Sequence, residues 1–195
     1  SALRVAKFTL AVATPGAAAA YRRAATAQAD AGLIGGRVVY IDAPGLVQTD
    51  GGVWNRWTGV CRNVNQGARP AETLPPAAER LDHISGASVV ATRAFVETVG
   101  PMAEDYFLYY EEVDWAARRG ALRLVGAPEA LVRHHGGTVI GTGSVARRAS
   151  SFANYFNYRN RARFMRRFRP LALPTTYAWS LAQLARIWLS GGRRE

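Results

Sequence analysis

The sequence has little cysteine, little lysine and no long apolar run. Because Cys61 is the only cysteine, no internal disulfide can form, and nothing indicates an oxidising compartment. No stretch of about eighteen apolar residues occurs, which argues against a membrane-spanning helix. The first residue is Ser1 rather than methionine, and no signal peptide is evident, so we expect the chain to be a fragment.

Acidic residues are also scarce, and the basic excess consists almost entirely of arginine. The 195 residues carry 25 Lys and Arg against 14 Asp and Glu, which gives a net charge of +11, and Lys7 is the only lysine. Guanidinium groups bind phosphates bidentately, which favours anionic ligands, nucleic acid or an anionic membrane over neutral partners. A compositional bias towards alanine and arginine would give the same excess. With 49% hydrophobic residues, the chain is long enough for one globular domain, with room for an appendage.

Patterns typical of helices and of strands alternate along the chain. The segments predicted as helices are residues 16–29, 93–99 and 112–119, and a long basic helix that starts at residue 150 or 151. The segments predicted as strands are residues 32–41, 88–92, 122–125 and 130–133. Residues 42–82 are expected to be irregular, and residues 136–144 to form a loop rich in glycine and threonine. This alternation predicts a layered α/β domain.

Five of the fourteen acidic residues fall within residues 104–114, in the segment EDYFLYYEEVD. Two interpretations of this cluster stay open. Glu111, Glu112 and Asp114 suit the first turn of a short helix, where carboxylates meet free N–H groups and the positive end of the helix dipole. Alternatively, the apolar run at residues 106–110 is buried and brings the carboxylates straight out of the core. Partial desolvation at such a place suits a general base.

Five short segments occur in a fixed order: SGA at residues 85–87, VGPM at 99–102, FLYYEEVD at 107–114, APEALVRHH at 127–135 and YRNR at 158–161. Together they resemble glycosyltransferase family 2, and most closely the bacterial rhamnosyltransferase-like group that builds surface polysaccharides. The resemblance extends from about Thr14 to Pro170, which is most of the chain.

The resemblance implies part of a GT-A fold, with a mixed, mostly parallel sheet in residues 1–158 and a helical tail in residues 159–195. Members of this family invert the anomeric carbon in one displacement, in which a carboxylate takes the proton of the acceptor hydroxyl. By its position Glu112 is the expected general base, a glutamate where aspartate is typical. Glu111 is expected to be a supporting catalytic group.

Further residues take their expected roles from their places in the motifs. The residues expected to bind substrate are Ser85, Gly86, Ala87, Asp114, Arg159 and Asn160. His134 is expected near the metal and the diphosphate, and the complete enzyme is expected to use Mg²⁺ or Mn²⁺. An ordinary structural role is the open alternative in each case, such as a tight turn at a glycine or a hydrogen-bonded histidine.

One part of the family pattern is missing from this sequence. The nucleotide-binding half, which ends in an Asp-X-Asp motif, belongs before about Pro15, where only fourteen residues stand. Thr9, Leu10 and Ala11 occupy the place of that motif and offer no carboxylate. We therefore expect this chain alone not to bind a sugar nucleotide normally. Ala103 is a smaller departure, where the family often has aspartate.

The tail combines arginines with aromatic and aliphatic residues. Residues 159–169 interleave six arginines with Phe and Met, and residues 171–189 carry Tyr, Trp, Leu and Ile. This pattern fits a helix that lies on an anionic membrane. A helix that covers the core, or a contact between two copies of the chain, fits equally well. Nucleic acid is not an expected partner, because the sequence contains an acidic cluster and no recognisable reader motif.

Two functional hypotheses follow. The first is an inverting glycosyltransferase, or the acceptor-binding part of one. It would transfer a sugar, such as rhamnose, from a UDP- or dTDP-sugar to a polysaccharide or lipid-linked glycan at the cytoplasmic face of the plasma membrane. The second is a non-catalytic GT-A-derived module that binds glycan, a partner protein or the membrane surface. An upstream nucleotide-binding half with its Asp-X-Asp motif would favour the first.

Overall fold

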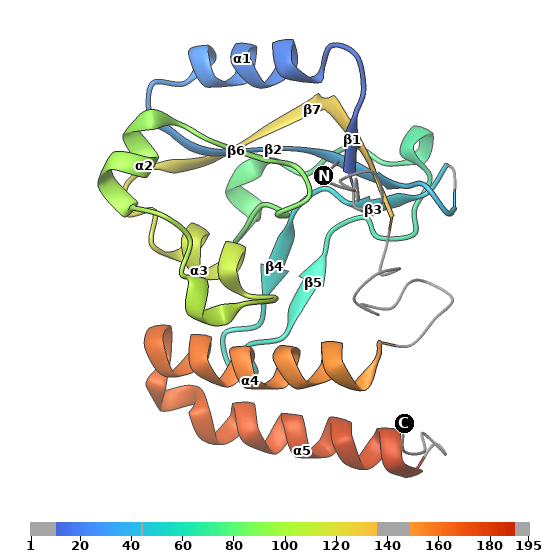
Figure 1. Ribbon diagram of the computed structural model, residues 1–195, viewed down its shortest axis with the longest axis vertical. Helices are drawn as coiled ribbons and strands as arrows, with labels where there is room; N and C mark the ends of the chain where they lie inside the picture. The colour runs from blue at the N-terminus through green and yellow to red at the C-terminus, as the bar shows by residue number, and fades with distance from the viewer. Residues whose placement is uncertain (1–10, 44, 136–148, 190–195) are drawn as a thin grey trace, which may run out of the picture.

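The computed structural model describes residues 11–43, 45–135 and 149–189, which form a sheet flanked by helices, with a pair of long helices below it (Figure 1). The strands are β1 (Ala11–Ala13), β2 (Ala31–Tyr40), β3 (Val47–Thr49), β4 (Gly52–Trp54), β5 (Cys61–Asn63), β6 (Val89–Ala91) and β7 (Arg123–His134). The α-helices are α1 (Ala17–Ala27), α2 (Arg93–Val99), α3 (Glu111–Ala117), α4 (Ser151–Phe168) and α5 (Leu173–Leu189). Four short 3₁₀ helices are η1 (Pro70–Glu72), η2 (Ala78–Arg80), η3 (Glu104–Tyr106) and η4 (Pro170–Ala172).

The main sheet is mixed, which confirms the predicted α/β class. Its strand order is β1-β7-β2-β3, and β6 also pairs with β2, while β4 and β5 form a separate two-stranded sheet. Only the β2–β7 pair is parallel, whereas β1–β7, β2–β3 and β2–β6 are antiparallel. The sheet is thus mixed, as expected: the parallel β2–β7 pair is its longest pairing, and the short strands β1, β3 and β6 add antiparallel partners beside it.

Strand β7 is continuous where the sequence predicted two brief strands. Its parallel register with β2 runs from Ala31 opposite Arg123 to Tyr40 opposite His134, with an irregularity after Gly36. At that irregularity Gly36 is opposite Ala127 and the next residue of β2 is opposite Leu131. The gap contains a proline, which has no N–H to donate to a neighbouring strand. The interruption read from the sequence is thus a bulge within one strand.

The two faces of the sheet are covered by different helices (Figure 1). On one face Ala17 and Ala20 of α1 pack against Ile34 and Val125 of the central strands. On the other face a cluster formed by α2, α3 and the neighbouring loops packs against the sheet; its buried members are Leu33, Leu81, Ile84, Phe95, Trp115, Ala116 and Leu124. Since side chains alternate along a strand, adjacent residues of β2 and β7 enter different clusters.

A third cluster joins the acidic segment to α4. Tyr106, Tyr110 and Val113 pack against Phe164 and Met165 of α4, which are fully buried. The domain boundary predicted between residues 158 and 159 falls inside this helix. Helix α4 therefore belongs to the core, and only α5 stands apart from it.

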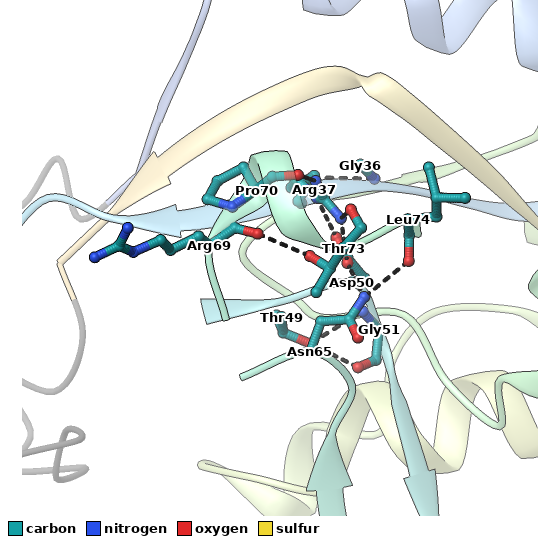
Figure 2. Close-up of polar contacts among 11 residues, drawn as sticks. Gly36, Arg37, Thr49, Asp50, Gly51, Asn65, Arg69, Pro70, Thr73 and Leu74 are labelled. Carbon is teal, nitrogen blue, oxygen red and sulfur yellow. Dashed lines mark hydrogen bonds and ion pairs between the residues drawn. The ribbon is translucent and has the colours of Figure 1, made fainter. Parts of the chain in front are cut away.

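A buried ion pair anchors the segment that was predicted to be irregular (Figure 2). Arg37 of β2 donates from Nε and Nη2 to the two carboxylate oxygens of Asp50, each at 2.8 Å, and also binds the carbonyls of Pro70 and Thr73. Asn65 donates to the same carboxylate at 2.7 Å. Buried charges need such complete pairing. The network fixes residues 61–74 against the sheet, although that segment contains little regular structure.

Among the described residues, no helix is long and apolar enough to cross a membrane. Thr9 and Leu10, expected in the place of the Asp-X-Asp motif, and the predicted loop at residues 136–144 lie outside the described residues.

Candidate active site

A cavity of about 1000 Å³ opens between the β3–β5 region, the residues after β7 and the start of α3. Its wall brings together six of the nine residues that the sequence singled out. Those six are Ser85, Gly86, Ala87, Glu111, Glu112 and His134. Residues from three separate segments of the sequence thus converge on one cavity, and Asp114, Arg159 and Asn160 do not line it.

The two glutamates are presented by a strained loop. Phe107, Tyr109 and Tyr110 have φ angles of 63°, 64° and 70°, in a region that residues with a side chain rarely adopt. Each such residue costs of the order of 1–3 kcal/mol and persists only where the surrounding structure holds it. Tyr110 is fixed by its hydroxyl, which donates to the carbonyl of Gly59 at 2.8 Å. The chain turns sharply here and places Glu111 at the first position of α3.

Asn160 of α4 holds this loop from below. Its Nδ2 donates to the carbonyls of Tyr106, Leu108 and Tyr109 at 2.9, 2.5 and 3.0 Å, and the side chain is fully buried. Because carbonyls only accept, the atom that faces them must be the amide nitrogen. Asn160 was predicted to bind substrate. The structure gives it a positioning role instead, since its donors are used by the loop that carries the glutamates.

Glu111 and Glu112 are electrostatically unusual. Burial, and secondarily the neighbouring charge of Glu111, raises the pKa of Glu112 to about 8. Burial also raises the pKa of Glu111. The Oε2 atom of each carboxylate is buried and has no hydrogen-bond partner among the described residues. Carboxyl groups in this condition bind a proton near neutral pH and are suited to exchange it with a ligand.

Asp114 has a structural role. It is fully buried, and its carboxylate accepts from Arg118 Nε at 2.7 Å, from Arg167 Nη1 at 2.9 Å and from the Tyr106 hydroxyl at 3.1 Å. These contacts tie α3 to α4. The substrate contact expected of Asp114 finds no support in these contacts, because the carboxylate is already paired and Asp114 does not line the cavity. Within the same short helix, Asp114 thus has a structural role, whereas Glu111 and Glu112 are the carboxylates available for chemistry.

Arg159 does not line the cavity either. Its Nη2 donates to the carbonyl of Asp105 at 2.9 Å, and its guanidinium lies over the Phe156 ring at 5.5 Å from the centroid. The adjacent positions on α4 point in different directions, since successive residues of a helix diverge by about 100°. The substrate contact predicted for Arg159 is replaced by support of the loop before α3.

The SGA segment, residues 85–87, forms part of the cavity wall. A Cβ built on Gly86 would have no heavy atom within 4 Å, and Gly86 does not have a positive φ. Neither crowding nor backbone conformation therefore requires glycine at this position. The open space beside it belongs to the cavity, which fits a place where a ligand approaches the backbone.

His134 lies at the end of β7 and is half-buried. Its Nδ1 is 2.8 Å from Gln48 Oε1, and burial lowers its pKa, so the imidazole is neutral at physiological pH. A neutral imidazole can bind a metal ion. However, no group of three His, Cys, Asp or Glu side chains suited to a metal occurs within residues 11–43, 45–135 and 149–189. His134 can thus provide one ligand, and the described residues do not complete a site for Mg²⁺ or Mn²⁺.

The most informative cavity residue that sequence reasoning missed is His83. It is 4% exposed and lines the cavity, and neither ring nitrogen has a hydrogen bond among the described residues. Burial lowers its pKa to about 4, so the ring is neutral. Buried polar groups are normally paired, and an exception calls for an explanation such as a ligand. The signal was its position in the sequence, two residues before the SGA segment.

Cys61 and Arg62 also line the cavity, and no sequence motif marked either of them. Burial raises the pKa of the Cys61 thiol to about 12, which excludes it as a nucleophile near neutral pH. Arg62 is exposed and is the arginine of the cavity wall. It adds a positive charge to a cavity whose other charged groups are the two glutamates.

Comparison with known proteins assigns no relative to this chain. No family model matches the sequence, and no curated protein matches it significantly. The interpretation of the cavity therefore depends on its own residues.

Proposed function

We propose that this chain is the acceptor-binding part of an inverting glycosyltransferase, with Glu112 as the general base. The observation that carries the proposal is the pair of buried carboxylates with raised pKa values in a cavity large enough for a sugar. A base is most effective when its pKa lies near the working pH, and a pKa of about 8 for Glu112 meets that condition. The sequence resemblance to glycosyltransferase family 2 supports the same assignment.

In the proposed reaction the acceptor hydroxyl gives its proton to Glu112 while its oxygen attacks the anomeric carbon of the donor. The bond between that carbon and the nucleoside diphosphate breaks, and the diphosphate leaves with the electron pair. Glu111 orients acceptor hydroxyls, and His83 forms part of the wall that encloses the acceptor. Arg62 supplies positive charge to the leaving diphosphate.

The donor we propose is a UDP- or dTDP-sugar, with rhamnose suggested by the resemblance, and the acceptor is a polysaccharide or a lipid-linked glycan. The reaction would take place at the cytoplasmic face of the plasma membrane, where such acceptors are assembled. A divalent ion is proposed for the complete enzyme only. No step here is assigned to it, because the described residues contain no group of three His, Cys, Asp or Glu side chains suited to hold it.

The test is sugar transfer by the full-length protein, with labelled UDP- and dTDP-sugars and a membrane extract as acceptor. We expect Glu112→Gln to abolish transfer while donor binding is retained, because the amide keeps the shape but cannot take a proton. Glu104→Gln is the matched control, since Glu104 is an exposed acid in the same segment, and it should transfer at the wild-type rate. Undiminished transfer by Glu112→Gln would refute the base assignment.

The second candidate is a non-catalytic module that binds glycan in the same cavity. The same cavity with its two glutamates suits glycan hydroxyls whether or not a transfer step follows. In that case Glu112→Gln would bind oligosaccharide as tightly as the wild type, and neither protein would transfer sugar from any donor. Isothermal titration with the acceptor oligosaccharide, beside the transfer assay, separates the two candidates.

A further inference from the structure

Helix α5 is amphipathic, but its polar side faces the rest of the domain and its apolar side faces outward. Its contact with α4 is polar: Arg161 donates from Nη1 to Gln183 Oε1 at 2.8 Å and from Nη2 to Ser180 Oγ at 2.9 Å. Thr176 is fully buried, and its hydroxyl donates to the carbonyl of Ala172 at 2.9 Å. A surface helix normally directs its apolar residues towards the core. Here the polar residues are inside.

The apolar residues of α5 are outside. We call them the outer face of α5; its large members are Tyr177, Trp179, Leu181, Leu184, Trp188 and Leu189, each between 47% and 77% exposed. Leu171, just before the helix, is 94% exposed. Single exposed apolar residues are ordinary, but a contiguous set of this size marks a surface that binds something apolar.

The helices that carry this face are strongly basic. Residues 149–189 contain seven arginines and neither aspartate nor glutamate. Arg166, Arg169 and Arg186 are exposed and have no carboxylate partner among the described residues. Both helices of this pair, or their ends, therefore carry positive charge that no carboxylate of the described residues neutralises.

We propose that the outer face of α5 lies in the boundary between headgroups and acyl chains of an anionic phospholipid bilayer, with the three free arginines at lipid phosphates. Tryptophan and tyrosine favour this boundary because one part of the side chain is apolar and the other can hydrogen-bond. The helix would lie along the surface, as interfacial helices with basic flanks do. This inference depends on the helical pair α4–α5 and does not require the proposed activity.

A second copy of the chain is the main competing occupant. A helix pair is sealed by a narrow apolar stripe, and Tyr177, Leu181, Leu184 and Trp188 would form one. The apolar surface is wider than that, because Leu189 and the exposed alanines at positions 178, 182 and 185 extend it around the helix. Two such surfaces would also bring two sets of unpaired arginines together. Width and charge both favour a lipid surface.

The experiment is flotation of the whole chain with vesicles of phosphatidylcholine alone and of phosphatidylcholine with phosphatidylglycerol in equal parts. We expect the wild type to float strongly with the anionic vesicles. Leu181→Ser, Leu184→Ser and Trp188→Ser combined should lose binding at least about 100-fold. This variant should keep its melting temperature, since the three side chains are already exposed.

A second variant tests the charge separately. Arg166→Gln, Arg169→Gln and Arg186→Gln combined should weaken binding to the anionic vesicles roughly 100-fold, at about fivefold for each arginine near the surface. Its weaker binding to phosphatidylcholine should not change, and salt should abolish the difference between the two lipids.

The matched control combines Leu74→Ser and Val96→Ser, which remove exposed apolar side chains outside the helical pair. This control should bind as the wild type does. Vesicle binding that survives the three serine substitutions would overturn the proposal. A second result would also overturn it: the wild-type protein floats with neither kind of vesicle and is a dimer in light scattering, whereas the serine variant is a monomer. In that case α5 would bind a second copy of the chain. Neither result would affect the glycosyltransferase proposal, which is tested by transfer.

Discussion

The sharpest prediction concerns Asn160, the residue that holds the strained loop before α3. Replacing it by alanine removes an amide nitrogen that lies 2.5–3.0 Å from three carbonyl oxygens. The amide has two N–H groups to share among these carbonyls, and each hydrogen bond contributes about 1 kcal/mol net, so we expect Asn160→Ala to lower the free energy of unfolding by about 2 kcal/mol. The loop contains three residues with positive φ, so it is the part of the molecule expected to relax first.

Asn160→Asp should be worse than Asn160→Ala. The substitution preserves the shape but directs a carboxylate oxygen at three carbonyls, which can only accept. The loss should grow as pH rises, because a buried aspartate in this place is tolerated only when it carries a proton. The measurement is urea unfolding at several pH values.

Asn154→Ala is the matched control, because Asn154 is on the same helix and its Nδ2 makes one long bond, 3.4 Å to the carbonyl of Ala149. It should cost less than about 1 kcal/mol. A second readout is the titration of Glu112, followed by NMR of its carboxyl carbon. If the loop relaxes in Asn160→Ala, the pKa of Glu112 should fall from about 8 towards its ordinary value of 4.5. An equal loss of unfolding free energy in Asn160→Ala and Asn154→Ala would refute the role of Asn160 in holding the loop.

Three further predictions concern the cavity and α3. The folded protein keeps the Glu112 proton that the unfolded chain releases between about pH 4.5 and 8, so wild-type stability should fall with rising pH in that window, by up to about 1.4 kcal/mol per pH unit. Denaturation of Glu112→Gln should lack this slope, and a matching slope would contradict the raised pKa. His83→Leu should raise the free energy of unfolding by about 1 kcal/mol, since two ring nitrogens without hydrogen-bond partners leave the interior, and it should weaken oligosaccharide binding. A less stable variant would show that His83 has a structural role. Asp114→Ala should lower the free energy of unfolding by about 3 kcal/mol, because two arginines lose a buried partner. Asp105→Ala breaks a half-exposed ion pair and should cost less than about 1 kcal/mol in the same thermal melts. Equal losses would contradict the structural role of Asp114.

Helices α1 and α2 and strand β2 were predicted from the sequence, because local interactions along the chain determine them. The helix predicted at residues 93–99 is α2 as observed, with Thr92 as its N-cap, since the hydroxyl accepts from the Phe95 N–H. The helix-forming run at residues 16–29 contains α1, and the buried strand at residues 32–41 is β2 within one residue. These segments have a cap, a periodicity or an apolar run that a single stretch of sequence displays.

Strand pairing between segments far apart in the sequence could not be predicted from such local patterns. Strand β3 and the sheet β4–β5 fall in a segment predicted to be irregular, and they are held by the Arg37–Asp50 network. The charges of Arg37 and Asp50 suggest surface residues when read alone. Only their mutual approach, at 2.8 Å, makes burial possible.

The sequence by itself determined that this is an α/β chain, and it selected six of the residues that meet in the cavity. The aromatic run before the glutamates was expected to be buried, but only Tyr106 and Tyr110 are, whereas Phe107 is 72% exposed. Tertiary structure decided which carboxylates are available for chemistry. Asp114 is neutralised by Arg167, 53 residues away, whereas Glu111 and Glu112 face the cavity without such a partner. It also decided that Asn160 supports the loop and that α5 turns its apolar side outward. The physical reason is that charge pairing and exposure depend on neighbours in space, which one segment of sequence does not contain.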